Sequence, residues 1–435
     1  MAHAITLTDG TTTIDLFSIA NTFVISDGWA MVTADDPDTE VGDVINLLIQ
    51  AASATAMQTV IRNINRLLDA ARRRAETGVG AMVYITVQFD GISETQRTPI
   101  LAGRLEVPNA LNQWGTRKIE ATLAITHPAW WESTTETELQ LSAASQTAAT
   151  GGRTLTNSAN SWASIAAAQV GGDLPAPLRL ELTNTAGAAR VYENLWLALN
   201  ADHDPENFGY FIEGETASGG SSVADGNCSG GNARDITVNP TGTLTYALSA
   251  ANMQRTRGAP FVILARLQSL SGAGVSVRPS ITAAGVTVWR ANEPWVLNRL
   301  TPHLSMLGTV PLPPQVWDSA SNGAVNLVLT FYAAASRTVR LDYLALLPAQ
   351  DHRLLTLMGN SVANNDTVVD NGTEGWAGVR SSSAILPVVS TRRKPLMARP
   401  NTTQRIYLFH HTATGCLIGD TVSLRAWYRP RRSAV

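Results

Sequence analysis

The stretch NQWGTRKIEATLAITHPAWWE, residues Asn112–Glu132, decides how the first part of this 435-residue chain folds. Every second residue from Ile119 to Ile125 is apolar, and the residues between them are polar or small. This period of two predicts a strand with one buried face. The pattern stops at Pro128, and two tryptophans and a glutamate follow before a Ser/Thr-rich run. The stretch therefore predicts the last strand of a β-domain.

One amphipathic helix is predicted upstream of that strand, over residues Ala54–Glu76. Its apolar residues recur at helical spacing: Met57, Val60, Ile61, Ile64, Leu67, Leu68 and Ala71. Ser53 or Thr55 can cap the start of the helix, and Gly78 lies just past its end. Further strands are predicted over 82–89, 98–107 and 117–126. Together these elements predict a β-sandwich that carries one helix.

Length and composition favour a multidomain, β-rich protein. A chain of 435 residues is too long for one ordinary core, so two or three domains are expected. The residues are 44% hydrophobic and 15% charged, and the net charge of −3 gives no overall footprint for nucleic acid. No run of 18 apolar residues occurs, so no membrane insertion is expected. No leader pattern opens the chain, which predicts synthesis in the cytoplasm.

Composition and strand patterns divide the chain into four segments. Residues 1–137 contain the sandwich with its helix, and 138–203 contain a Ser/Thr/Ala/Gly-rich linker followed by the first strands of a second β-module. Residues 204–350 contain several strands without a helical pattern, which is typical of a jelly roll. Residues 351–435 return to strands and are predicted to complete the second module. The jelly roll is therefore predicted to be an insertion.

Catalytic motifs are mostly missing from the sequence. The G-x-S-x-G elbow, the phosphate-binding loop, H-E-x-x-H and the dinucleotide glycine pattern do not occur. His410 and His411 are adjacent on a predicted strand, so they point to opposite faces and are expected to be packed or surface residues. Cys228 and Cys416 lack metal-like spacing, and one disulfide between them is allowed but not required. The sequence therefore predicts a protein that is not an enzyme.

Three acidic residues form an exception within the third segment. Glu213 and Glu215 lie on its opening strand, and Asp342 lies on its closing strand in the run Leu341-Asp342-Tyr343. This pattern resembles the calcium-containing jelly-roll carbohydrate-binding modules, which begin with an E-A-E-like strand and close on an L-D-Y-like strand. The resemblance implies a structural Ca²⁺ held by the three carboxylates, because Ca²⁺ takes 6–8 oxygen ligands. The alternative is that these carboxylates are solvated at a strand edge. No other cofactor is expected.

Sugar binding needs exposed aromatic rings that stack against the faces of sugar rings. The resemblance makes three tryptophans candidates for such platforms, namely Trp289, Trp295 and Trp317. Tryptophan is also common in cores and at subunit interfaces, and that alternative stays open for each of them.

The two ends of the chain resemble the distal tail and tail-tip proteins of siphophage-like bacteriophages. Three short motifs carry the resemblance: Pro128-Ala129-Trp130-Trp131-Glu132, Gly172-Asp173-Leu174-Pro175-Ala176-Pro177, and the ends Arg405-Ile406-Tyr407-Leu408 and Trp427-Tyr428-Arg429-Pro430-Arg431. The resemblance implies a hexameric ring around the tail channel and a galectin-like second module. It also implies location in the virion tail, contacts with tail-tube and other tail-tip proteins, and host-surface polysaccharide as a further partner.

The helix supplies candidate contacts for a neighbouring subunit of such a ring. Arg62, Arg66 and Arg72 lie on its polar face, and plain solvation of that face is the alternative. Two other interpretations of the whole chain stay open. One is a tail-tube subunit with decorating domains, and the other is a free, lectin-like carbohydrate-binding protein. An enzyme that degrades surface polysaccharide ranks last, because no catalytic constellation is found.

Overall fold

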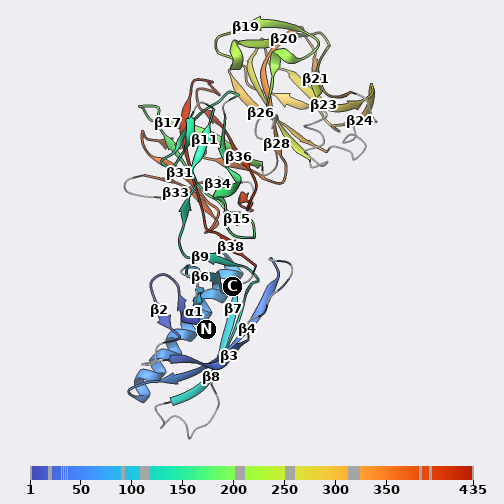
Figure 1. The fold of residues 1–435 in the computed structure, drawn as a ribbon. Helices are drawn as coiled ribbons and strands as arrows, with labels where there is room; N and C mark the ends of the chain where they lie inside the picture. The colour runs from blue at the N-terminus through green and yellow to red at the C-terminus, as the bar shows by residue number, and fades with distance from the viewer. Residues whose placement is uncertain are drawn as a thin grey trace. The chain divides into compact units, whose positions relative to one another are not determined.

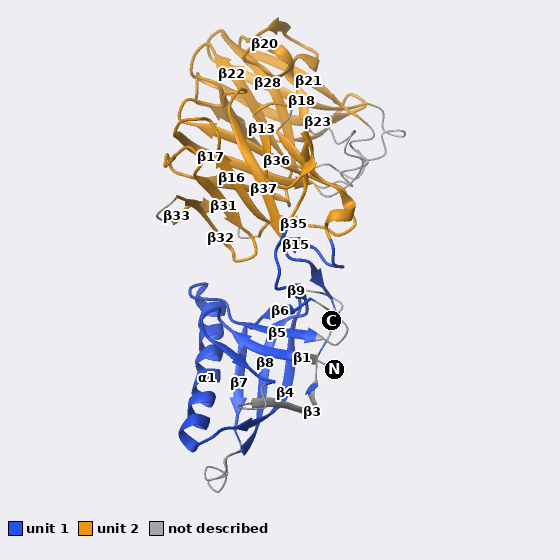
Figure 2. Ribbon diagram, turned by 60° about the vertical axis from the view of Figure 1, so that its left-hand side comes forward, with its two compact units in different colours: residues 1–137, 171–176, 429–435 blue, residues 138–170, 177–428 orange. Residues whose placement is uncertain are grey.

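The computed structural model describes residues 2–17, 22–30, 32, 34, 36, 38–89, 94–107, 118–144, 146–159, 161–200, 211–249, 260–311, 324–381, 385–390 and 394–433. The chain forms two compact units (Figure 2). The first contains residues 1–137, 171–176 and 429–435, and the second contains 138–170 and 177–428. The predicted fold class is confirmed: the protein is mainly β, with an N-terminal sandwich carrying one helix, a galectin-like sandwich and an inserted jelly roll (Figure 1).

Two sheets build the first unit. The order in the six-stranded sheet is β2-β1-β5-β6-β9-β38, and its strands are β1 (Ala2–Thr8), β2 (Thr13–Asp15), β5 (Tyr84–Phe89), β6 (Gln96–Pro99), β9 (Trp131–Ser133) and β38 (Arg431–Arg432). The order in the four-stranded sheet is β3-β4-β8-β7, and its strands are β3 (Thr22–Ala30), β4 (Glu40–Gln50), β7 (Ala102–Glu106) and β8 (Lys118–Pro128).

The predicted strand over 98–107 is wrong, because the chain changes sheets within it. β6 ends at Pro99 in the six-stranded sheet, and β7 starts at Ala102 in the four-stranded sheet. Proline has no N–H for a ladder and is therefore found at strand ends. The apolar residues next to the break are buried whichever sheet they belong to. The apolar pattern of the sequence therefore continues across the break.

The helix α1 spans Ala54–Thr77, which confirms the prediction to within one residue. The Ser53 hydroxyl accepts a hydrogen bond from the Ala56 N–H at 3.1 Å, and Gly78 ends the helix at φ 72°. The helix lies beside β7 (Figure 2), and its buried residues Ile64, Leu67, Leu68 and Ala71 join the core of the unit. A Cβ at Gly103 on β7 would lie 2.7 Å from Leu68 Cδ2, so glycine allows this close approach. Among the described residues no helix is apolar enough over its length to span a membrane.

The long pair of β4 and β8 gives the first unit one open face. The two strands pair along their full lengths, from Glu40 opposite Pro128 to Gln50 opposite Lys118. Burial alternates along both strands. The inward residues join a core with the helix and the six-stranded sheet. The outward residues are mostly small or polar: Gly42, Val44 and Asn46 on β4, and Glu120, Thr122 and Ala124 on β8.

The galectin-like part of the second unit has two large sheets. One follows the order β10-β37-β16-β31-β32-β33, with β13 paired to β37. Its strands are β10 (Thr137–Glu138), β13 (Arg153–Thr156), β16 (Arg179–Asn184), β31 (Thr367–Asn371), β32 (Trp376–Arg380), β33 (Ile385–Pro387) and β37 (Thr421–Tyr428). A small pair joins β15 (Ala176–Pro177) to β35 (Met397–Ala398), and η1 spans Ala167–Gln169.

The other large sheet of this part follows the order β12-β11-β14-β36-β17-β29-β34, with β30 paired to β17. Its strands are β11 (Leu141–Ala143), β12 (Gln146–Ala149), β14 (Trp162–Ile165), β17 (Arg190–Asn200), β29 (His352–Thr356), β30 (Ser361–Val362), β34 (Val389–Ser390) and β36 (Gln404–Thr412).

Two further sheets contain only strands from within 211–349. One follows β19-β20-β28-β22-β26 with β18 paired to β28, and the other follows β21-β27-β23-β24 with β25 paired to β23. The elements are β18 (Phe211–Glu213), η3 (Gly214–Thr216), β19 (Ser221–Ala224), η4 (Ser229–Gly231), β20 (Asn232–Val238), β21 (Thr241–Leu248), β22 (Phe261–Leu270), β23 (Val275–Ala283), β24 (Val286–Arg290), β25 (Trp295–Leu297), β26 (His303–Val310), β27 (Val325–Ala333) and β28 (Arg337–Pro348).

The core of this jelly roll continues into the galectin-like part. The Tyr343 ring lies 4.6 Å from that of Phe211 and 5.9 Å from that of Phe409, which belongs to β36. Cys228 and Cys416 are buried, free thiols, so the disulfide that the sequence allows is not formed. Burial raises the pKa of each thiol to about 12, which keeps both protonated.

Candidate functional site

Parts of the three motifs that carry the tail-protein resemblance meet within the first unit, whereas residues 405–408, 427 and 428 of the third motif belong to the second unit. β38 pairs with β9, which places Arg431 opposite Glu132. The Glu132 carboxylate is 1% exposed and accepts hydrogen bonds from Arg97 at 3.0 and 2.9 Å. Arg431 Nε lies 3.5 Å from the other oxygen of this carboxylate, and its guanidinium lies 3.6 Å from the centre of the Trp130 ring. These motif residues therefore form one buried network.

The middle motif closes the same network. The Asp173 N–H donates to the Arg431 carbonyl at 2.9 Å, and the Asp173 carboxylate accepts from the Ser433 N–H and hydroxyl. Gly172 has φ +92°, and a Cβ there would lie 2.3 Å from the Arg431 carbonyl oxygen. Only glycine combines this backbone conformation with this approach. The motifs that look functional in the sequence are thus joined by structural contacts.

The three candidate arginines of the helix differ in their contacts. Arg66 donates to the Thr12 hydroxyl at 2.6 Å, and Arg72 pairs with Asp69 at 3.1 Å along the helix. Arg62 is exposed and makes no ion pair within the part of the chain that the structure describes. Two of the three side chains are therefore already engaged by their own chain.

Glu213, Glu215 and Asp342 lie near the turn η4. Ser229 donates its N–H to Asp342 at 2.8 Å and its hydroxyl to Glu213 at 2.8 Å. Burial, together with the neighbouring carboxylates of Glu215 and Asp342, raises the pKa of Glu213 to about 7, while the Ser229 hydrogen bond opposes the shift. One oxygen of Glu213 and one of Glu215 are buried without a partner among the described residues.

Asp342 departs from the predicted calcium set. It forms a buried ion pair with Arg266, whose Nε also donates to the Cys416 carbonyl at 2.8 Å. Burial raises the pKa of Asp342 to about 6, while Arg266 opposes that shift. A guanidinium thus already matches this charge. In the described ranges no group of three or more His, Cys, Asp or Glu side chains is placed to hold a metal ion. The three-carboxylate set does not fit calcium, and only the two glutamates keep unmatched oxygens.

Two of the three candidate tryptophans meet in one pocket. Trp289 and Trp295 line a cavity of about 400 Å³ together with the polar residues Asn292, Glu293 and Thr309. Trp295 is 43% exposed, and its indole packs directly on the backbone of Gly308, where a Cβ would lie 3.0 Å from the ring. Trp289 is partly buried against the core. Trp317 lies outside the described residues.

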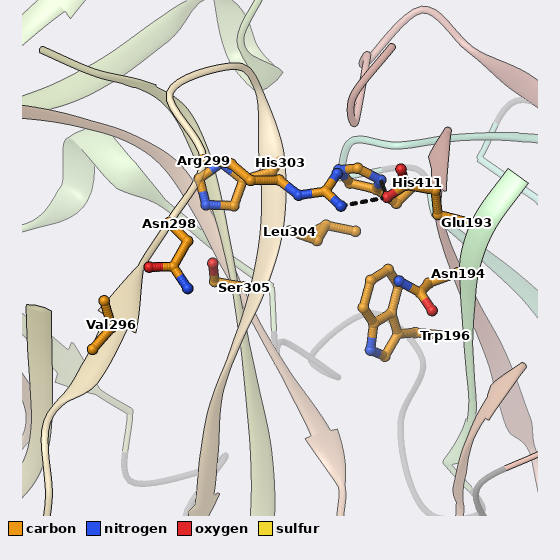
Figure 3. A pocket seen from close by; sticks show the side chains of 10 residues that line it. All are labelled: Glu193, Asn194, Trp196, Val296, Asn298, Arg299, His303, Leu304, Ser305 and His411. Atoms are coloured by element: carbon orange, nitrogen blue, oxygen red, sulfur yellow. Dashed lines mark hydrogen bonds and ion pairs between the residues drawn. The ribbon is translucent and has the colours of Figure 1, made fainter. Parts of the chain in front are cut away.

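A second pocket, of about 210 Å³, lies between β17, β36 and β26 within the second unit. Figure 3 shows Asn298 and Ser305 on one side of it and Trp196 on the other, with the Arg299 side chain reaching toward Glu193. Its lining residues come from β17 (Glu193, Asn194 and Trp196), from β36 (His411), and from β25, β26 and the chain between them. Because no spacing motif connects these positions, sequence reasoning missed the pocket.

Charge is balanced within this pocket. Arg299 donates to Glu193 at 2.7 Å, and His411 Nδ1 lies 3.1 Å from the same carboxylate oxygen. Arg299 also approaches His411 Nε2 at 3.3 Å. Burial, aided by the positive charge of Arg299, lowers the pKa of His411 to about 4. His411 is therefore neutral near pH 7, and the cation of Arg299 matches the anion of Glu193.

Two buried nitrogens in the same pocket lack partners. Trp196 and His303 are 5% and 3% exposed, and Trp196 Nε1 and His303 Nε2 have no hydrogen-bond partner among the described residues. His303 Nδ1 lies 2.8 Å from the Thr301 carbonyl, which can only accept, so Nδ1 carries the proton. Burial lowers the pKa of His303, so Nε2 presents a lone pair. Two residues that line the pocket thus carry one unused donor and one unused acceptor, both buried.

Comparison with known proteins gives structural similarities at low scores. No family model matches the chain, and no curated protein does. Among solved structures, the baseplate of phage P2 in its activated conformation with Ca is 8% identical with a TM-score of 0.30, and the match covers 99% of each chain. The carbohydrate-binding module CBM36 with calcium and xylotriose is 15% identical with a TM-score of 0.19, covering 31% of this chain and 98% of that chain.

An exo-β-1,3-galactanase from Phanerochaete chrysosporium is 10% identical with a TM-score of 0.21, covering 70% of this chain and 78% of that chain. Scores of this size carry no functional argument. What the sites can bind therefore has to follow from their own geometry.

Proposed function

We propose that this chain is a non-catalytic structural subunit of a phage tail tip, a distal tail protein whose first unit forms a hexameric ring around the tail channel. The observation that supports this proposal is the open four-stranded sheet. Among the described residues β3 pairs only with β4, and β7 only with β8, so each outer strand keeps one edge for another chain. Head-to-tail pairing of two different edges closes into a ring when the rotation fits.

The outward face of β4 and β8 suits a channel wall. Its residues are mostly small or polar, and its large apolar side chains among the described residues are the exposed Val44 and the half-buried Leu48. In this proposal the sheet faces the lumen and the tube above it. Residues 138–203 and 351–435 form a galectin-like carrier, and the inserted 204–350 module lies on the periphery.

The oligomeric state tests the ring. Size-exclusion chromatography with light scattering should give six times the mass of the chain, and negative-stain images should show rings. Arg62→Glu should weaken the ring, because the exposed Arg62 side chain has neither an ion pair nor a hydrogen bond among the described residues. Arg72→Glu is the matched control, since Arg72 already pairs with Asp69. Monomer alone at micromolar concentration would overturn the proposal and favour a free lectin-like protein, whereas tubes would favour a tail-tube subunit.

We propose further that the Trp289/Trp295 pocket binds host-surface glycan. Trp295 presents a half-exposed indole fixed from behind by Gly308, and polar side chains border it. This is the arrangement that stacking on a sugar face requires. On a glycan array, Trp295→Ala should abolish binding and Trp289→Ala should weaken it, while Trp376→Ala on β32 should change nothing. Unchanged binding by Trp295→Ala would remove the platform role.

A further inference from the structure

The pocket between β17, β36 and β26 has the properties of a ligand site rather than of a packing defect. At about 210 Å³ it has room for several water molecules but lies below the 300–1,000 Å³ typical of drug-sized ligands. Its walls come from two β-modules of the same compact unit. Most of its lining is polar, which distinguishes it from an apolar cavity that stays dry.

The electrostatics of this pocket favour a neutral ligand. The Glu193 carboxylate is matched by the guanidinium of Arg299, and His411 Nδ1 lies 3.1 Å from the same oxygen. His303 and His411 are uncharged near neutral pH, because burial lowers the pKa of both. The next cation, Arg266, is paired with Asp342. An ionised ligand would therefore bring a charge with no free counter-charge into a half-enclosed space, which is costly.

The unused hydrogen-bonding groups favour hydroxyls. Trp196 Nε1 can only donate, and His303 Nε2 can only accept in its Nδ1-protonated form. Asn298 and Ser305 add side chains that both donate and accept at the side facing Trp196 (Figure 3). A ligand that satisfies all four must carry several groups that donate and accept, as hydroxyls do. Leaving buried polar groups unmatched is unfavourable, so a ligand that matches them gains affinity.

We propose that this pocket is a second binding site, for a single ring of a neutral, polyhydroxylated molecule such as a hexopyranose. It shares no lining residue with the Trp289/Trp295 pocket, so the two sites stand or fall independently. In the bound state the ring hydroxyls accept from the Trp196 N–H and donate to His303 Nε2. Arg299 and Glu193 form one wall and stay paired with each other.

Ligand-detected NMR on the full chain tests this site. The background is Trp289→Ala/Trp295→Ala, which removes the other pocket, and the probes are the methyl glycosides of glucose, galactose, N-acetylglucosamine and rhamnose. At least one should bind at millimolar concentration. Trp196→Phe removes the donor and keeps an apolar ring, so it should weaken that binding at least ten-fold, about 1.4 kcal/mol. Methyl glucuronide, which carries a carboxylate, should bind more weakly than methyl glucoside.

Two milder variants guard against a folding effect at the buried Trp196. Asn298→Ala and Ser305→Ala change an exposed and a half-buried side chain and should each weaken binding several-fold. Asn292→Ala, in the other pocket, is the matched control and should have no effect. The proposal is overturned if no neutral glycoside binds the folded background variant. It is equally overturned if Asn298→Ala and Ser305→Ala leave the Kd unchanged, or if the glucuronide binds best.

Discussion

Two clusters centred on a glutamate differ in a way that separates structure from function. Glu132 lies between Arg97 and Arg431 and is 1% exposed, so its own chain encloses it. Glu193 also meets an arginine, Arg299, and in addition a histidine, but it borders a cavity where nitrogens of neighbouring side chains have no partner. The charges are similar. Both clusters hold polar atoms without a hydrogen-bond partner among the described residues, and what distinguishes the Glu193 cluster is the free volume beside it.

The largest expected effect is on the enclosed cluster. Glu132→Ala should lower the free energy of unfolding of the first unit by about 3–5 kcal/mol, because it leaves two arginines uncompensated in a buried network. Glu193→Ala should cost the second unit at most about 1 kcal/mol, since its pair with Arg299 is half-exposed. Calorimetry of the full chain measures both transitions. Equal losses in the two variants would mean that enclosure by the chain does not set how much each carboxylate contributes to stability.

The second prediction concerns how tightly the enclosed cluster is packed. Gly172→Ala forces both a positive φ and a Cβ within 2.3 Å of the Arg431 carbonyl oxygen. Gly10→Ala, in the same unit, also has a positive φ but meets nothing within 4 Å. The control should cost about 1–2 kcal/mol, and Gly172→Ala about 1–3 kcal/mol more. Urea denaturation of both variants measures the difference, and a difference of zero would mean that the junction yields freely.

His410 and His411, which are adjacent on one strand, show the same contrast between an enclosed side chain and one that borders the cavity. His411 borders the cavity, whereas His410 is 1% exposed, packs edge-on to Tyr192 and has two ring nitrogens without partners among the described residues. Burial, with Arg190 and His411 adding to it, lowers the pKa of His410 to about 3. The unfolded chain takes up this proton near pH 6.5, so the contribution of His410 to stability is complete above that pH. It is lost as pH falls toward 3.

His410→Gln should remove one proton's worth of this acid sensitivity, about 1.4 kcal/mol per pH unit between pH 6.5 and 4. The slope of the free energy of unfolding against pH is compared between the variant and the parent chain. Asp342 and Asp370, whose pKa values burial raises to about 6, contribute with the opposite sign in that range. Above pH 7 the two proteins should have parallel stability curves. Parallel curves at acid pH as well would mean that His410 is already protonated in the folded state.

Local signals made the helix and many strands predictable from sequence. Ser53 and Gly78 act within a few residues of the helix ends, so the predicted bounds agree with Ala54–Thr77. The strand over 98–107 failed because the apolar pattern records burial and not the sheet to which a residue belongs. Pro99 was the one local sign of the break.

The candidate sites also divide into those with a local signal in the sequence and those that only the fold assembles. Trp289 and Trp295 are six residues apart and form one pocket, so a local concentration of tryptophan was informative. Glu193, Arg299 and His411 lie more than 100 residues from one another along the chain, and only the fold brings them together. The Leu341-Asp342-Tyr343 pattern predicted that Asp342 binds calcium, but Asp342 pairs with Arg266 instead. An ion pair between two strands leaves no trace in a short sequence motif, so the pattern could not show it.

The smallest expected effect concerns a third glutamate-centred cluster, in which the unmatched atoms are acceptors. Glu213 and Glu215 each keep one buried oxygen without a partner among the described residues, and we propose that these two, without Asp342, hold Ca²⁺.

At ten times the Kd, Ca²⁺ should stabilise the second unit by about 1.4 kcal/mol over chelator-treated protein. Glu215→Gln should abolish that gain. Asp225→Asn should preserve it, because Asp225 is occupied by Arg340. A gain that survives Glu215→Gln would place the cation elsewhere. No gain at all would mean that unmatched acceptors beside Ser229 are tolerated without a ligand, which would weaken the same inference for the Glu193 pocket.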